Sequence, residues 1–158
     1  MLDALLPQRL DNEYRGSRVA LWLFGLVVAL KGTQSLAILF NGRSTAMGAD
    51  GVPLDTFAPE AAQTVVAIFA QASLWRLFFC LVGALVLMRY RRGVPLMFSL
   101  FALNYLAAQL AFAFVPLPRV GAPVGPVVNL ILFVLMLVGL GLSLWRRGGP
   151  AATERPAT

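Results

Sequence analysis

The chain has 158 residues, of which 59% are hydrophobic and only 13% charged, and its mean hydropathy is +0.77. A soluble domain is about 45–50% apolar and about 25% charged, and a soluble protein of this size could not hide so much apolar surface from water. The composition therefore excludes a soluble globular enzyme, a disordered tail and a coiled coil. The net charge of +6 suggests nucleic-acid binding only if the basic residues gather on one helix or loop.

The sequence contains no histidine and a single cysteine, Cys80. The lack of histidine excludes imidazole acid–base chemistry and histidine-ligated haem, and a single cysteine excludes intramolecular disulfides and thiolate clusters. No activated nucleophile can be identified either. We therefore predict no catalytic residue, no cofactor and no metal site, and Cys80 is interpreted as a small buried apolar residue.

Four apolar segments are each long enough to cross a hydrocarbon core of about 30 Å as a helix. They cover residues 19–40, 61–88, 95–115 and 126–145. Backbone exposed to lipid must satisfy its own hydrogen bonds, so the segments predict an all-α fold, an integral membrane four-helix transmembrane bundle over residues 19–145. The second segment, at 28 residues, exceeds what the bilayer requires. Its first turns protrude, lie at the interface, or are accommodated by tilt.

The basic residues alternate between the two sides that four spans create. Nine lie on the side of the termini and only two, Arg43 and Arg119, on the other. The nine are Arg9, Arg15, Arg18, Arg89, Arg91, Arg92, Arg146, Arg147 and Arg155. The positive-inside rule then predicts that both termini are cytoplasmic. The basic balance is thus explained by topology, and we expect no nucleic-acid partner.

Two flanking segments complete the predicted organisation. Residues 1–18 form a cytoplasmic segment whose leucines at positions 2, 5, 6 and 10 have the helical spacing of a segment lying on the membrane surface. Residues 146–158 are rich in Pro, Ala and Gly and are predicted to be a disordered cytoplasmic tail.

Two cations interrupt the apolar segments, Lys31 in the first and Arg76 in the second. Lys31 follows Arg18 by 13 residues and Arg76 precedes Arg89 by 13, so both lie about 20 Å from the inner boundary at about 1.5 Å per residue. Each costs about 2.5–3.5 kcal/mol to place at mid-bilayer. The two helices run in opposite directions, so the cations are predicted at one depth on neighbouring helices.

No acidic residue occurs in any of the four segments, so the partners of these cations must come from elsewhere. Amides at a similar depth are Gln34, Asn104 and Asn129, and the first outer loop supplies Asp50, Asp55 and Glu60. We consider two interpretations. In one, Lys31 and Arg76 face an outward-open polar cavity that receives an anion, a lipid headgroup or the carboxylate of a partner. In the other, Lys31 extends its ammonium outward toward the membrane surface (snorkelling), and loop acids and carbonyls satisfy Arg76. These contacts then have only a structural role, because they hold the bundle in register.

The first outer loop, residues 41–60, carries turn signals at Asn41-Gly42, Asp50-Gly51 and Val52-Pro53. Its interleaved apolar residues Val52, Leu54 and Phe57 indicate a loop that folds back onto the mouth of the bundle. The spacing of its acids does not match a calcium-binding loop.

Four short motifs, NGR at 41–43, DGVPLDTF at 50–57, RYR at 89–91 and LSLW at 142–145, together resemble uncharacterised four-span inner-membrane proteins of Gram-negative bacteria. The resemblance covers most of the chain, and it implies location and topology without an activity. A looser similarity to DoxX-like four-helix membrane proteins rests only on size and number of spans.

Three functions follow from these observations, in decreasing order of support. The first is a non-enzymatic inner-membrane protein that acts as an accessory or assembly partner, or that binds an anionic or lipid-like ligand. Binding would use the polar layer in the outer half of the bundle, which is formed by Lys31, Arg76 and the nearby amides. Its partners would be the bilayer, an anionic lipid or small anion, and a membrane-protein partner or second copy. The second is a small anion transporter or channel subunit. The third is a membrane enzyme.

Overall fold

The computed structural model describes residues 12, 14 and 16–145. The predicted tail 146–158 and most of the segment 1–18 lie outside these residues. Four long helices dominate, α2 (Arg18–Phe40), α4 (Pro59–Arg89), α5 (Val94–Phe114) and α6 (Val124–Leu144). Three short ones complete the order, α3 (Gly42–Gly48), η1 (Leu54–Thr56) and η2 (Arg91–Gly93). The prediction of an all-α four-helix bundle is confirmed, and no bound of a long helix departs by more than two residues from the expected segment.

The helix ends follow from local chemistry. Ser17 precedes α2 in an extended conformation, and its side-chain oxygen accepts a hydrogen bond from the Val19 amide at 3.3 Å, the N-cap arrangement that satisfies one otherwise unpaired donor. Both α4 and α5 carry proline in their first turn, at Pro59 and Pro95, where the missing N–H removes no helical bond. These signals place the helix starts close to the boundaries of the apolar segments.

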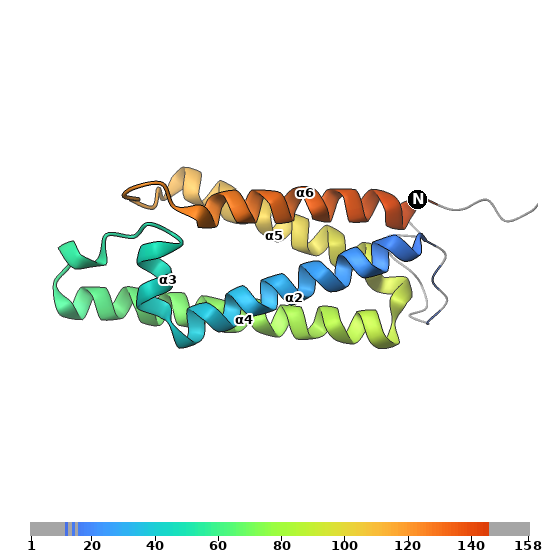
Figure 1. The fold of residues 1–158 in the computed structure, drawn as a ribbon, viewed down its shortest axis with the longest axis horizontal. Coiled ribbons are helices and arrows are strands. Elements are labelled where there is room, and N and C mark those ends of the chain that lie inside the picture. Colours follow the sequence, from blue (N-terminus) through green and yellow to red (C-terminus); the bar gives the residue numbers. More distant parts are fainter. Residues whose placement is uncertain (1–11, 13, 15, 146–158) are drawn as a thin grey trace, which may run out of the picture.

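The long helices pack in a defined order. α2 lies along both α4 and α6, and α5 packs along α6 (Figure 1). An aromatic cluster joins three of them, with the Phe24 ring of α2 packed edge-on to the Phe98 ring of α5 at 4.9 Å between centroids. The Phe79 ring of α4 lies tilted at 54° to the Phe101 ring of α5, at 4.7 Å between centroids. This cluster forms the core toward the end that carries Arg18, Arg89 and the η2 arginines, called here the arginine end.

The outer faces of the four helices are apolar. Large side chains such as Trp22, Trp75 and Leu110 are 83%, 70% and 61% exposed, which no soluble monomer tolerates over four helices. All four helices are long and apolar enough to cross a membrane. The exposed apolar faces and the helix lengths together indicate a multi-pass membrane protein whose surface contacts lipid.

The loop between α2 and α4 folds into a small cap (residues 42–57) at the opposite end, called the cap end. Ala46 of α3, Val52 and Leu54 are buried against Ala62 in the first turns of α4. α3 runs crosswise to the long helices near the end of α2, and α4 extends past it (Figure 1). The expectation that the loop folds back is confirmed, and the extra length of α4 is explained because its first turns carry the cap. The α3 helix itself was not predicted, since its two glycines and lack of apolar periodicity gave no helix signal.

The α5–α6 contact makes a testable prediction. A Cβ added to Gly139 would overlap the buried Phe98 ring, whereas a Cβ at Gly141, on the same helix, would meet nothing within 4 Å. We expect Gly139→Ala to lower the free energy of unfolding by about 1–3 kcal/mol through overpacking. Gly141→Ala should leave it equal or raise it by up to about 1 kcal/mol, because alanine favours helix. Unfolding in mixed detergent micelles measures both, and equal effects of the two changes would contradict this packing.

Candidate functional site

Lys31 lies on the buried face of α2 and is only 9% exposed. The same face carries Val27, Val28 and Ser35 at helical spacing. The Lys31 ammonium donates a hydrogen bond of 2.6 Å to the side-chain oxygen of Asn129 in α6. The amide thus satisfies part of the charge without neutralising it, and it ties α2 to α6 across 98 positions of sequence.

Arg76 lies on the face of α4 that packs against α2, between the buried residues Ser73 and Cys80. Its side chain is half-buried. Within the part of the chain that the structure describes, it has no carboxylate within 4 Å and no hydrogen-bond partner. A guanidinium carries five donors and stays charged, so this is an unusually poor environment for it.

The two cations interact with each other. Lys31 and Arg76 are close enough for their charges to repel, and both also act on Cys80, one turn beyond Arg76. The nearby hydroxyls do not supply negative charge, since Ser35 donates to the Lys31 carbonyl at 2.9 Å and Ser73 donates to the Ala70 carbonyl at 2.7 Å. The layer between α2, α4 and α6 therefore holds the positive charges of the buried Lys31 and the half-buried Arg76, and no carboxylate among the described residues contacts either of them.

Asp50 is the acid that the cap brings toward this layer. The Ala49 carbonyl accepts the Gly125 amide of α6 at 2.8 Å, and a Cβ on Gly125 would be 2.8 Å from the Asp50 Oδ1 atom. Asp50 therefore lies against the first turn of α6, where the helix dipole favours negative charge. Burial raises the pKa of the Asp50 carboxyl, against the opposing effect of the positive charges of Arg76 and Arg119.

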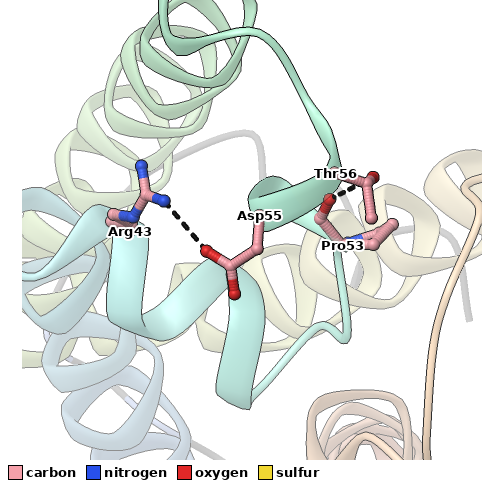
Figure 2. Close-up of polar contacts among 4 residues, drawn as sticks. All are labelled: Arg43, Pro53, Asp55 and Thr56. Carbon is pink, nitrogen blue, oxygen red and sulfur yellow. Dashed lines mark hydrogen bonds and ion pairs between the residues drawn. The ribbon is translucent and has the colours of Figure 1, made fainter.

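Asp55 does not reach the cations. Its carboxylate pairs with Arg43 at 3.0 Å on the outside of the cap (Figure 2), where the two side chains are 68% and 57% exposed. Thr56 closes the same turn by donating to the Pro53 carbonyl at 2.8 Å (Figure 2). Glu60 is exposed in the first turn of α4. Of the loop acids considered as counter-charges, only Asp50 is placed toward the bundle.

The remaining predicted residues divide between the layer and the periphery. Gln34 is half-buried one turn beyond Lys31 on α2, whereas the Asn104 side chain is exposed on α5. α5 turns a different face inward, with Tyr105 stacked on Phe133 of α6 at 4.5 Å between ring centroids. The structure thus brings together Lys31, Asn129, Arg76 and, from above, Asp50, and it leaves Asn104 and Asp55 outside.

A tie between the two loops of the cap end was not visible in the sequence. The Gly51 carbonyl accepts the Val120 amide at 2.8 Å, and Gly51 has a φ of 72°, a left-handed conformation that glycine adopts without strain. The Asp50-Gly51 pair signals a turn, but its partner in the second loop depends on the fold. Arg119 of that loop stacks over the Phe112 ring at 5.6 Å.

Comparison with protein-family models, curated proteins and solved structures gives no match. Groups of three or more metal-ligating His, Cys, Asp or Glu side chains do not occur among residues 16–145.

The hydrogen bond between Lys31 and Asn129 can be tested by stability. We expect Asn129→Leu to lower the free energy of unfolding by about 1–3 kcal/mol, because it leaves a buried charged donor without its acceptor. Asn104→Leu is the matched control: the same exchange at an exposed position of α5 should leave stability equal or higher in a micelle. An Asn129→Leu variant as stable as the control would contradict the proposed tie between α2 and α6.

Proposed function

We propose that the protein is a non-enzymatic membrane protein that binds one anionic group, such as a phosphate or carboxylate, between Lys31 and Arg76. The observation that carries the proposal is the pair formed by the buried Lys31 and the half-buried Arg76, which no carboxylate of the described residues contacts. Ionisable groups within membrane segments are expensive to insert, and they are functional by default. Ammonium and guanidinium groups on facing helices are the donors that bind oxyanions.

Binding is better supported than transport. The layer lies toward the cap end, and below it the aromatic cluster of Phe24, Phe98 and Phe101 fills the core between the helices. An ion crossing the bundle would have to pass this apolar cluster. A small anion transporter or channel subunit would therefore require the cluster to open, whereas a binding protein uses the packing as it stands.

We further propose that the arginine end faces the cytoplasm of a bacterium and that the cap lies on the outer side of its inner membrane. The positive-inside rule supports this orientation, since Arg18, Arg89, Arg91 and Arg92 all lie at the end opposite the cap. The anionic group would then come from the outer leaflet or from the outer aqueous side. An accessory role beside another membrane protein fits the same site, with the partner supplying the carboxylate.

Anion binding is tested with methyl sulfate, a small singly charged oxyanion, by calorimetry in maltoside micelles, whose headgroups carry no charge. We expect Lys31→Gln and Arg76→Gln each to weaken binding by at least about tenfold, because each removes one full charge from a buried oxyanion contact. Arg43→Gln is the control, because it removes an exposed cation of the cap. Native mass spectrometry of protein from gentle detergent distinguishes a lipid ligand, retained as an added phospholipid mass, from a soluble anion.

Two results would contradict the proposal. One is the absence of methyl sulfate binding to folded protein that also carries no co-purified anion or lipid. The other is unchanged binding in the two interior variants when their thermal unfolding matches that of the Arg43→Gln control.

The orientation is tested separately by cysteine labelling in a Cys80→Ala background. Ser44→Cys is exposed in the cap and Tyr90→Cys is exposed at the arginine end. In intact spheroplasts a membrane-impermeant maleimide should label Ser44→Cys, and it should label Tyr90→Cys only after the membrane is opened. The reverse pattern would show that the cap faces the cytoplasm.

A further inference from the structure

The cap holds the Asp50 carboxylate in a fixed place above the cation layer. Backbone hydrogen bonds on either side of it, from Gly125 to the Ala49 carbonyl and from Val120 to the Gly51 carbonyl, are both 2.8 Å long. Its Oδ1 atom occupies the space that the missing side chain of Gly125 leaves open. Asp50 is therefore positioned by the fold rather than by an ion pair of its own.

Asp50 acts on Arg76 without contacting it. Asp50 lies against Gly125, which is one turn before Asn129, the hydrogen-bond partner of Lys31, on α6. Its charge also acts on that of Arg76, yet no Asp50 oxygen is within 4 Å of the guanidinium. The other acid of the cap behaves differently, since Asp55 pairs directly with Arg43 at 3.0 Å. A carboxylate kept near a buried cation, but out of contact with it, contributes charge while leaving the donors of that cation available to a ligand.

The charges of the layer then determine what it can accept. Lys31 and Arg76 contribute two positive charges and Asp50 one negative, and Arg119 is exposed where solvent screens it. One further negative charge brings the net charge of Lys31, Arg76, Asp50 and the ligand to zero. A second one would face the Asp50 carboxylate as an unbalanced like charge, an arrangement that is disfavoured strongly in a partly desolvated site.

We infer that Asp50 is the specificity-determining residue of the site, which it restricts to singly charged anionic groups, such as a phosphodiester or a carboxylate, against doubly charged ones. The inference rests on the proposed function, because it assumes that Lys31 and Arg76 bind the anion. A phosphodiester in a phospholipid headgroup and the carboxylate of a small soluble acid both carry such a single negative charge.

The experiment compares methyl sulfate with sulfate, which both present terminal oxygen atoms on a tetrahedral sulfur but carry one and two negative charges. Affinities are measured by calorimetry for the full-length wild type, Asp50→Asn and Asp55→Asn in maltoside micelles. We expect the wild type to prefer methyl sulfate, and Asp50→Asn to shift the affinity ratio toward sulfate by at least about tenfold, since removing one like charge favours the dianion most. Asp55→Asn should keep the wild-type ratio, because Asp55 lies outside the layer.

Only folded molecules bind the two anions, so the ratio of the affinities for methyl sulfate and sulfate stays the same when a variant is partly unfolded. Binding that depends on Lys31 and Arg76, with an equal ratio in the wild type and Asp50→Asn, would overturn the role of Asp50 while leaving the proposed function in place. Absence of binding of either anion to the wild type and to Asp50→Asn, in folded protein that carries no co-purified anion or lipid, would instead remove the proposed function itself. A shift of equal size in Asp55→Asn would also overturn the inference, because it would show a general effect of the charge on the cap.

Discussion

The hydrogen bond between Lys31 and Asn129 is the interaction around which the cap half of the bundle is arranged. A buried ammonium requires an acceptor, and the acceptor is on α6, so α2 must stay close to α6 at this level as well as to α4. α2 is thereby held between its two neighbours. Arg76, on the face of α4 that meets α2, is brought beside Lys31 as a consequence.

The two halves of the bundle are consequently stabilised by different interactions. Toward the arginine end, edge-on aromatic packing of Phe24, Phe98 and Phe101 fills the core between α2 and α5. Toward the cap end, the interior carries charge, so its packing must supply hydrogen bonds and counter-charge. The cap meets this need because its apolar residues Val52 and Leu54 anchor it on α4, while its backbone is bonded to the start of α6. These contacts of the cap with α4 and α6 place Asp50 beside the layer.

The sequence predicts the spans closely because a run of about 20 apolar residues is a property of consecutive positions, and the bilayer thickness requires nothing else. It also predicts that Lys31 and Arg76 lie at one level of the bundle, since helical rise is constant, and the charges of the two side chains interact in the structure. It could not assign the partners, which depend on how each helix is rotated and where each loop docks. Asn129 and Asn104 look equivalent as amides in apolar segments, yet only Asn129 faces Lys31. Asp50 and Asp55 differ by five positions, and the turn at Gly51 sends one inward while the other pairs with Arg43 outside.

The energetics of Arg76 are what separate a structural role from a binding role. A buried ion pair or network can offset the desolvation of its charges, but a lone buried cation is destabilising relative to an apolar residue of similar size. Lys31 recovers part of this loss through Asn129. Arg76 has no comparable partner among the residues that the structure describes, and its repulsion from Lys31 adds to the loss. A leucine at position 76 would pack into the same interface between α2 and α4 without either penalty. Retaining the arginine brings this chain no gain in stability by itself, and the proposed anionic ligand would supply the counter-charge that the described residues do not place in contact with it.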